Sequence, residues 1–373
     1  MKALITGGAG FIGSHLADLL ISRGMEVRVL DILDPQVHGP DAGRPGYLND
    51  KAELIIGDVR DRDTVSGAME GCGILVHFAA AVGVGQSMYR MSHYTSVNDL
   101  GAAVVLEAAA EKRSRLRKML VASSMSIYGE GLYSCPDCGS FAPELRPHEQ
   151  LKKHLWEVRC PRCGAEASPL PVPETKRLFP ASIYAINKRS HEEMFLVAGR
   201  AYGIPATALR FFNVYGTRQA LSNPYTGVGA IFASRLLNGN PPVIFEDGLQ
   251  SRDFIHVQDL CRACLLALEE PSASDNVYNI GTGRAQTVLD VGRAIARELG
   301  QPDDDFIIRN QFRAGDIRHC FADVSKAERD LGFTAGIPFE EGVKELCDWV
   351  SRSTSRDRVD AATDELERRG LTT

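Results

Sequence analysis

A glycine-rich stretch near the N-terminus reads Thr6-Gly7-Gly8-Ala9-Gly10-Phe11-Ile12-Gly13. It follows a short apolar run, residues 3–5, and opens an apolar-periodic segment that continues to Leu20, a pattern typical of a buried strand turning into a helix. Three of its glycines stand three positions apart (Gly7, Gly10 and Gly13), so the turn can be tight and a pyrophosphate can approach bare backbone. The N-terminus of the helix then offers free N–H groups to that anion.

Asp31 lies at a position that supports a dinucleotide-binding role for the glycine-rich turn. A second apolar run, residues 27–30, ends at this carboxylate, 31 − 13 = 18 positions after Gly13. In a dinucleotide-binding unit, a carboxylate near this position holds the hydroxyls of the adenosine ribose. Asp31 would repel a 2′-phosphate, so NAD is favoured over NADP. The alternative is a carboxylate that only caps a loop.

Length and charge limit the classes of protein. The 373 residues can bury a large core and predict two lobes or one elaborated domain. A formal net charge of −6 argues against a broad nucleic-acid or membrane-surface footprint. No apolar run approaches the roughly 20 residues that span a bilayer, and Met1-Lys2-Ala3 reads as the start of a strand rather than a signal peptide. We expect a cytoplasmic protein with no nucleic-acid or membrane partner.

Apolar runs alternate with helix-like segments beyond Asp31. Residues 54–56 lead to Gly57-Asp58-Val59, and residues 74–77 lead to Phe78-Ala79-Ala80. This alternation is typical of an α/β fold with a parallel, doubly wound sheet. Asp58 and Val59 would meet the adenine at a strand end, and the small residues after Phe78 would let a cofactor approach. A strand-end aspartate with ordinary packing residues is the alternative.

Hydroxyl groups follow the next predicted strand. An Ala- and Leu-rich helix is predicted over about residues 92–112 and carries Asn98. The strand at residues 119–122 then ends in the run Ser123-Ser124-Met125-Ser126-Ile127-Tyr128-Gly129. Polar groups at the carboxyl end of a parallel strand lie where such sheets bind ligands. A serine-rich turn without function is the alternative.

Residues 132–170 interrupt the alternation and contain two CPxCG knuckles. Cys135 and Cys138 form the first, Cys160 and Cys163 the second, with 160 − 138 − 1 = 21 residues between them. This spacing indicates a zinc ribbon rather than a disulfide framework. Four thiolates complete a tetrahedron and leave no open position, so we expect a structural ion. Cys261 and Cys264, by contrast, lie in an apolar helical run and are predicted to be buried core residues.

A helix predicted over about residues 182–202 carries Tyr184 and Lys188, which share a face because they are four positions apart. A neighbouring ammonium group stabilises phenolate and lowers the pKa of a tyrosine, so such a pair can remove a proton. Taken alone, the pattern is equally that of an ordinary surface pair.

The C-terminal third reads as a smaller α/β lobe. Its polar stretches are residues 209–216, 251–257 and 313–316. Their arginines suit a diphosphate because guanidinium pairs bidentately with phosphate oxygens, although lone arginines usually form surface ion pairs. The expected organisation is a Rossmann domain in residues 1–131, a zinc ribbon in 132–170, the catalytic helix and the end of the Rossmann domain in 171–215, a mainly substrate-binding lobe in 216–350 and a charged, solvated or partly helical tail in 351–373.

Together these motifs resemble the extended short-chain dehydrogenase/reductase family, in its branch of nucleotide-sugar epimerases and dehydratases. The similarity spans about residues 1–350, interrupted by the ribbon. It implies a Rossmann sheet and a homodimer formed through the helices near residues 92–112 and 182–202. It also implies that NAD contacts Gly7, Gly10, Phe11, Ile12, Gly13, Asp31, Asp58, Val59, Phe78, Ala79, Ala80, Asn98, Tyr184 and Lys188.

The resemblance further implies catalytic roles. Tyr184 would take the proton from a sugar hydroxyl, Lys188 would hold the nicotinamide ribose and lower the pKa of Tyr184, and Ser124 would hydrogen-bond the reacting oxygen. Asn98 would help to place the cofactor and the catalytic helix. Cys320 would occupy the position that limits substrate size, where a small side chain predicts a roomy pocket. The implied substrate contacts are Ser124, Ser126, Asn213, Arg252, Arg313 and Cys320.

Met125 and Ser126 separate the branches of the family. Its 4,6-dehydratases carry an Asp-Glu pair at these two positions, and its decarboxylases keep the glutamate. Neither methionine nor serine serves as an acid or base at neutral pH, so dehydration and decarboxylation are disfavoured. What remains is 4-epimerisation of a UDP- or dTDP-linked sugar with catalytic NAD, as in UDP-galactose 4-epimerase-like members. The run from Ser124 to Gly131 followed by the ribbon resembles a sub-branch that includes dTDP-L-rhamnose 4-epimerases.

Two alternatives stay open. A 4-dehydrogenase or 4-ketoreductase of the same fold would use the same three residues but consume its cofactor, and a non-catalytic NAD-binding scaffold would use the ribbon for a partner. The path from Ser124 to Tyr184 covers 184 − 124 = 60 positions, longer than is usual in the family. Since the ribbon adjoins catalytic residues at both ends, we hypothesise that it shapes one wall or lid of the sugar pocket.

Overall fold

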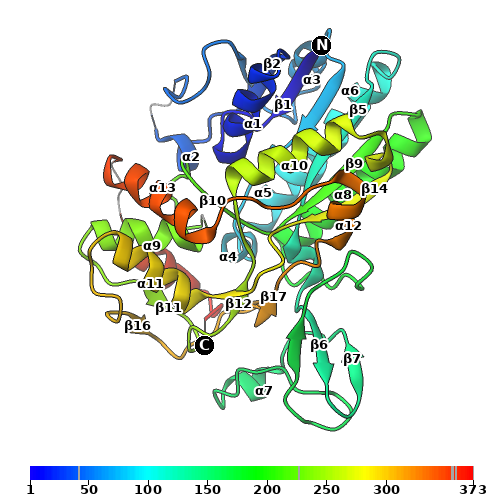
Figure 1. Ribbon diagram of the computed structural model, residues 1–373. Coiled ribbons are helices and arrows are strands. Elements are labelled where there is room, and N and C mark those ends of the chain that lie inside the picture. Colours follow the sequence, from blue (N-terminus) through cyan, green and yellow to red (C-terminus); the bar gives the residue numbers. More distant parts are fainter. Residues whose placement is uncertain (41–42, 226, 354–356, 358, 373) are drawn as a thin grey trace.

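The computed structural model describes residues 1–373 except 41–42, 226, 354–356, 358 and 373 (Figure 1). Its centre is a seven-stranded parallel sheet in the order β14-β9-β5-β4-β1-β2-β3. The order reverses beside β1, as in doubly wound dinucleotide-binding folds, so the predicted sheet is confirmed. Its strands are β1 (Lys2–Thr6), β2 (Glu26–Asp31), β3 (Glu53–Ile56), β4 (Ile74–His77), β5 (Lys118–Ser124), β9 (Ala206–Phe211) and β14 (Asn276–Ile280).

Helices cover both faces of this sheet (Figure 1). Apolar side chains of α1, such as Leu16 and Leu20, are fully buried against one face, because they recur at helical spacing. Phe195 of α8 is buried in the same way against the opposite face. One face is covered by α1 (Phe11–Ser22), α10 (Val257–Glu269) and α12 (Ser325–Leu331), the other by α3 (Arg62–Met69), α6 (Gly101–Glu111) and α8 (Ile183–Tyr202).

The start of α8 is set by its own sequence. The Ser182 hydroxyl accepts a hydrogen bond from the Ala185 N–H at 3.1 Å and caps the helix. Gly203, with φ of +69°, ends it in the left-handed conformation that favours glycine. The predicted helix over residues 182–202 is therefore confirmed, and its first turn places Tyr184 at the carboxyl edge of the sheet.

The helix expected over residues 92–112 is interrupted. It consists of α5 (Met91–Thr95), a π-helical turn (Ser96–Leu100) and α6. Such turns insert one residue into the helical ladder and are frequent at functional sites. Asn98, fully buried, lies within this turn.

A second cluster of elements packs beside the sheet. Buried side chains of α9 (Val228–Leu237), α11 (Val288–Glu298) and α13 (Phe339–Ser351), including Phe232, Ile295 and Leu346, form its core. Residues 257–280 and 325–331 return to the main sheet as α10, β14 and α12, so the expected substrate lobe of 216–350 is not continuous. Its short strands are β10 (Asn213–Tyr215), β11 (Val243–Ile244), β12 (Ser251–Arg252), β13 (Phe254–His256), β15 (Gln286–Thr287), β16 (Ile307–Ile308) and β17 (His319–Cys320).

The cysteine-rich insertion projects from the body of the molecule (Figure 1). It contains the antiparallel sheet β7-β6-β8 and a small core of Tyr133, Val158 and Ala167. We call residues 132–170 the ribbon. Its elements are β6 (Leu132–Cys135), β7 (Gly139–Phe141), α7 (His148–Leu151) and β8 (Ser168–Leu170).

The remaining elements are short, apart from a C-terminal helix. That helix, α14 (Val359–Arg368), buries Thr363 and Leu366. The tail was predicted to be either solvated or partly helical. The helix is confirmed over Val359–Arg368, and Thr363 and Leu366 are buried rather than solvated. None of the helices in the described part of the chain combines the length and apolar character needed to cross a membrane. The others are α2 (Pro35–His38), α4 (Val84–Ser87) and 3₁₀ turns at Met125–Tyr128 and Pro271–Ala273.

Candidate active site

A cavity of about 390 Å³ opens at the carboxyl edge of the sheet. Parallel strands end at one edge, so residues far apart in the chain meet there. All but one of the residues predicted to contact the cofactor line this cavity, the exception being Asn98. They are Gly7, Gly10, Phe11, Ile12, Gly13, Asp31, Asp58, Val59, Phe78, Ala79, Ala80, Tyr184 and Lys188, joined by Ser124.

The glycine-rich turn leaves room in this cavity. A Cβ at Gly7 would lie 2.6 Å from the Ala79 nitrogen, and one at Gly13 would lie 2.4 Å from the Gly7 oxygen. A Cβ at Gly10 would meet only the Gly7 oxygen, at 3.4 Å, among the described residues. Gly7 and Gly13 are therefore required by packing, whereas Gly10 keeps space free. With the unpaired N–H groups of the first turn of α1, this arrangement fits a dinucleotide pyrophosphate.

Two carboxylates, those of Asp31 and Asp58, line the cavity where the sequence predicts the adenosine. Asp31 accepts hydrogen bonds from the N–H groups of Ala9 at 3.0 Å and Leu33 at 2.9 Å, so it also fulfils the loop-capping alternative. Asp58 is bound by Arg60, whose Nε lies 3.0 Å from both carboxylate oxygens. This hydrogen bonding holds the pKa of Asp58 below its usual value. Arg60 lines the cavity and was missed, although its position two residues after a strand-end aspartate was a usable signal.

Ser124, Tyr184 and Lys188 lie together at the inner end of the cavity. The Lys188 ammonium donates to the Ala122 carbonyl at 3.0 Å, and burial lowers the pKa of Lys188 to about 8. The pKa of Tyr184 is raised to about 12 because burial of its hydroxyl outweighs the hydrogen bond with Ser124, which acts in the opposite direction. The lowering of this pKa that is expected from Lys188 stays a prediction, because burial outweighs the opposing effects and the net pKa is raised.

Asn98 acts behind the cavity rather than in its lining. Its Oδ1 accepts from the Ala81 N–H at 2.7 Å, and its Nδ2 donates to the Ala81 carbonyl at 3.2 Å. Ala81 itself lines the cavity. Asn98 thus holds a loop that borders the cavity and does not line the cavity itself, and its predicted part in placing the cofactor stays a prediction.

A second cavity, of about 360 Å³, adjoins the first, since Tyr225 lines both. The predicted substrate residues Ser126, Asn213, Arg252 and Arg313 line it. The Ser126 hydroxyl donates to Ser124 at 3.0 Å and so connects this cavity to the predicted catalytic residues. The buried Oδ1 of Asn213 has no hydrogen-bond partner within the described ranges, which suits an atom that a ligand satisfies.

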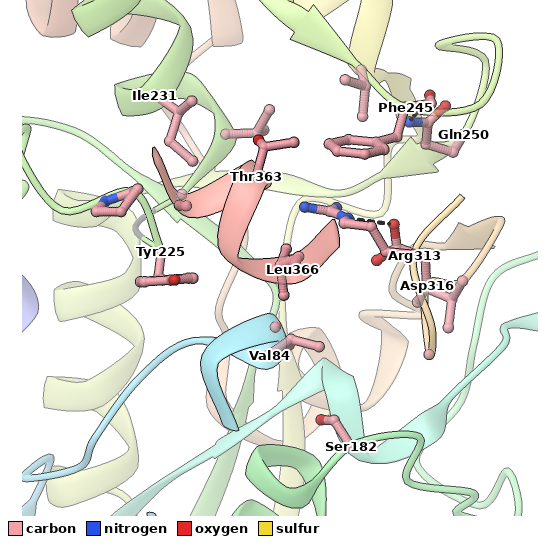
Figure 2. Close-up of a pocket in the computed structure, with 18 of the residues that line it drawn as sticks. Val84, Ser182, Tyr225, Ile231, Phe245, Gln250, Arg313, Asp316, Thr363 and Leu366 are labelled. Carbon is pink, nitrogen blue, oxygen red and sulfur yellow. Dashed lines mark hydrogen bonds and ion pairs between the residues drawn. The ribbon is translucent and has the colours of Figure 1, made fainter. Parts of the chain in front are cut away.

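The two arginines of this cavity differ in their surroundings. Arg313 is exposed, its guanidinium lies 4.5 Å from the centre of the Phe245 ring, and its Nε donates to Asp316 at 2.8 Å (Figure 2). Arg252 donates instead to backbone carbonyls, with Nη1 2.8 Å from the Ser251 oxygen and Nη2 2.7 Å from the Ile317 oxygen. Arg313 is thus freer to meet an anion. Phe245 was missed, because it lies in an apolar run like many core residues.

Cys320 does not line either cavity in the part of the chain that the structure describes. It is 1% exposed and packs in an apolar cluster with Met125 and Tyr128. The predicted direct contact between Cys320 and the sugar is therefore corrected: Cys320 lies behind Met125, which does line the second cavity. Its position one residue after His319 in β17 turns the side chain into the core.

The C-terminal helix α14 crosses the second cavity. Figure 2 shows Thr363 between Ile231 and Phe245, and Leu366 between Arg313 and Val84. The Ala314 N–H donates to the Leu371 carbonyl at 2.9 Å, so the tail also pairs with the backbone beside Arg313. These contacts were not predicted from the sequence, because the charged composition of the tail is typical of a solvent-exposed segment.

The four cysteines of the ribbon come together. The sulfurs of Cys135, Cys138, Cys160 and Cys163 all lie within 4.8 Å of one another. A tetrahedral zinc ion with bonds of about 2.3 Å separates its sulfurs by roughly 3.8 Å, so the cluster fits such an ion. Cys261 and Cys264 are buried in α10, at 2% and 0% exposure, as predicted.

A family model described as the NAD dependent epimerase/dehydratase family matches residues 3–150 and 164–281. The chain belongs to this family. The unmatched residues 151–163 fall inside the ribbon, so the main sheet and α8 of this epimerase/dehydratase both lie in the matched residues. The predicted short-chain dehydrogenase/reductase resemblance is confirmed at this level.

Relatives of this epimerase/dehydratase include 4-epimerases of nucleotide sugars. The dTDP-L-rhamnose 4-epimerase of Burkholderia thailandensis is 33% identical over 95% of this chain and 96% of its own. Among solved structures, the UDP-glucose 4-epimerase of Thermotoga maritima with UDP-glucose has a TM-score of 0.75, 30% identity and coverage of 94% and 99%. The UDP-glucuronic acid 4-epimerase of Bacillus cereus, with UDP-glucuronic acid and NAD, has a TM-score of 0.76, 26% identity and the same coverage.

Proposed function

We propose that this protein is an isomerase, a NAD-dependent 4-epimerase of nucleotide sugars. The observation that carries the proposal is that two cavities adjoin at Tyr225: one fits a dinucleotide and is lined by Ser124 and Tyr184, and the other is lined by Asn213 and Arg313 and reaches Ser124 through the hydroxyl of Ser126. The presence of Met125 and Ser126, instead of an acid and a base, leaves no group there for dehydration. The 4-epimerase relatives support the same activity.

Each catalytic side chain has a defined task in this proposal. Tyr184 takes the proton from the sugar C4 hydroxyl and later returns it, and Ser124 donates a hydrogen bond to the same oxygen. Lys188, buried beside them, supplies positive charge near the phenol. The glycine-rich turn and Asp31 would hold NAD, which would supply the acceptor for the C4 hydride and the donor for its return to the opposite face. The remaining cavity must then let the sugar turn over.

The substrate is proposed to be a dTDP-6-deoxyhexose such as dTDP-L-rhamnose, or a UDP-hexose. The B. thailandensis relative supports the first and the T. maritima structure supports the second. We place the diphosphate beside Arg313 and Asn213, with Arg252 supporting that wall. The resemblance also supports a cytoplasmic homodimer that uses the region of α5, α6 and α8.

The ribbon is proposed to hold one structural zinc ion through Cys135, Cys138, Cys160 and Cys163, because their sulfurs surround one point. The domain division that we propose places NAD on residues 1–131 and 171–215 with α10, β14 and α12. The substrate lies between this part and the elements around α9, α11, α13 and α14.

The test is to incubate the purified protein, without added reductant, with dTDP-L-rhamnose and UDP-glucose. Products are separated by chromatography while the absorbance of reduced nicotinamide is followed. An isomer of unchanged mass without accumulation of NADH is expected, and Tyr184→Phe should lower the rate by about 10²–10⁴-fold while retaining NAD. A product two hydrogens lighter with accumulating NADH would identify a dehydrogenase instead. If the protein binds NAD but converts neither nucleotide sugar, the result would favour the alternative of a non-catalytic NAD-binding scaffold.

A further inference from the structure

A cluster of buried ions joins the ribbon to the substrate cavity. At its centre is Arg146 of the ribbon, whose side chain is 2% exposed. Its Nε donates to Glu130 at 3.0 Å, and its Nη2 and Nη1 donate to the two carboxylate oxygens of Glu246 at 2.7 and 3.1 Å. Both glutamates are at most 2% exposed. A bidentate guanidinium–carboxylate pair fixes orientation as well as distance, so Arg146 defines where Glu246 lies.

Glu246 carries this contact into the cavity wall. It lines the second cavity next to Phe245. Its φ of +53° is one that a non-glycine residue rarely adopts, and such a conformation persists only where the surroundings impose it. Here the carboxylate is held by Arg146 and also by Arg318, at 3.0 Å, and the Glu246 N–H donates to the Gln311 carbonyl at 2.8 Å.

Arg313 receives support from Arg146 on two sides. One neighbour of its guanidinium is the Phe245 ring, which precedes Glu246 in the chain. The other is the Asp316 carboxylate, and the carbonyl of the same Asp316 accepts a hydrogen bond from Nη2 of Arg146 at 3.4 Å. In Figure 2, Phe245, Arg313 and Asp316 lie side by side on one wall of the cavity. Arg146 therefore contacts both sides of the Arg313 site: it binds the carboxylate of Glu246, the residue after Phe245, and the backbone carbonyl of Asp316.

A second residue of the ribbon supports Arg252. Glu157 accepts hydrogen bonds from Arg318 at 2.5 Å and from the His319 ring at 3.0 Å. Arg252 in turn donates to the Arg318 carbonyl at 2.9 Å. The ribbon thus contacts residues that hold Arg313 and Arg252 in place. None of its residues 132–170, all of which the structure describes, lines the second cavity. The hypothesis that the ribbon shapes one wall or lid of the pocket stays a prediction, and these contacts indicate that it would do so indirectly.

We propose that Arg146 is a positioning residue for the nucleotide sugar: by fixing Glu246 and Asp316 it holds Phe245 and Arg313 in the geometry that binds the nucleotide diphosphate. The proposal rests on the proposed function. It assigns the ribbon to substrate affinity rather than to the chemical step, because Ser124, Tyr184 and Lys188 lie on β5 and α8, outside the ion cluster. Integrity of the ribbon and affinity for the nucleotide are then linked.

The test compares Arg146→Met with Arg159→Met in the full-length protein carrying its NAD and zinc. Both substitutions remove one arginine from the ribbon, but Arg159 is exposed. Binding of UDP and dTDP is measured by titration calorimetry, and KM and kcat are measured with the sugar that the wild type converts. For Arg146→Met we expect the Kd and KM to rise at least tenfold, kcat to fall less than threefold, and NAD and zinc content to stay unchanged. Arg159→Met should match the wild type.

Removal of Arg146 takes one partner from each of two buried carboxylates, leaving Glu246 with Arg318 and Glu130 with the Arg318 N–H, and this loss can prevent folding. In that case Arg146→Lys carries the test, since lysine keeps the charge but cannot form the bidentate pair, and a rise of about threefold in Kd is expected. Unchanged Kd in a folded variant, or a loss in kcat with KM unchanged, would overturn the proposal while leaving the proposed function intact. A wild type that binds neither nucleotide would overturn both.

Discussion

At Gly10 and Gly13, the same added methyl group meets different surroundings. In Gly13→Ala the new Cβ would lie 2.4 Å from the Gly7 oxygen, so the turn must move, and both the melting temperature and the NAD affinity should fall. In Gly10→Ala the nearest described atom is 3.4 Å away, so stability should change by less than about 0.5 kcal/mol. The methyl group takes space from the pyrophosphate, however, and the Kd for NAD should rise about tenfold, or ~1.4 kcal/mol.

Thermal unfolding of the apoprotein and calorimetric titration with NAD measure the two effects separately. Wild-type NAD affinity in Gly10→Ala would show that the pyrophosphate does not lie against this turn. An unchanged melting temperature in Gly13→Ala would contradict the packing argument alone.

Lys188 should titrate far below an ordinary lysine. Burial lowers its pKa to about 8, so the ammonium is charged at pH 7 and loses its charge as the pH rises through 8. Activity that depends on this charge should therefore decline above pH 8. Lysine-selective ¹³C NMR of the apoprotein, assigned with Lys188→Met, measures the midpoint directly, and a midpoint near the unperturbed 10.4 would contradict the enclosed position.

At the scale of elements, α14 turns a charged tail into part of the substrate cavity. Arg235, 3% exposed on its side chain, is paired with Asp360 at 2.9 Å, and Arg309 is paired with Glu367 at 2.8 Å. These ion pairs orient the helix so that Thr363 and Leu366 face inward. Some charged residues of the tail therefore attach α14 to the rest of the protein through ion pairs, and others lie on its solvent-exposed face.

Substitutions on the two sides of α14 should separate these roles. Thr363 is 5% exposed and lines the cavity, whereas its neighbour Asp364 is exposed. Thr363→Phe should fill the cavity and raise KM for the nucleotide sugar at least tenfold, about 1.4 kcal/mol, with a smaller change in kcat. Asp364→Phe, which adds the same ring on the solvent side, should leave both constants unchanged. Equal kinetics for the two variants would mean that the substrate does not reach α14.

At the scale of the whole molecule, the ribbon should depend on its metal. We expect about one zinc ion per chain by elemental analysis, and none after Cys135→Ser and Cys160→Ser are combined. The ribbon has two small apolar clusters, one around Tyr133 and one in which Leu151 and Trp156 pack against Phe312, so it should unfold without the ion and the melting temperature should fall. Unchanged zinc content, folding and turnover in the double variant would contradict both the metal site and its link to the cavity.

The sequence by itself determined the parts of this protein that depend on local spacing. Alternating apolar runs were sufficient for the parallel sheet, Gly7 to Gly13 for the turn, Tyr184 and Lys188 for one helix face, and two CPxCG knuckles for the cysteine cluster. Each is a pattern within a few residues, set by the period of a helix or strand or by a ligand's geometry. The position of each strand's end then brought the cofactor residues together.

Only the tertiary structure decided how distant segments meet. Cys320 is turned toward Met125 rather than the cavity by its pairing in β17, the pKa of Tyr184 is governed by burial, and α14 lies across the substrate cavity. Arg146 lies 100 positions from Glu246, and nothing in the local sequence of either predicts their pair. Burial and ion pairing depend on what the folded chain places around a side chain, and that is a property of the whole packing rather than of any stretch of sequence.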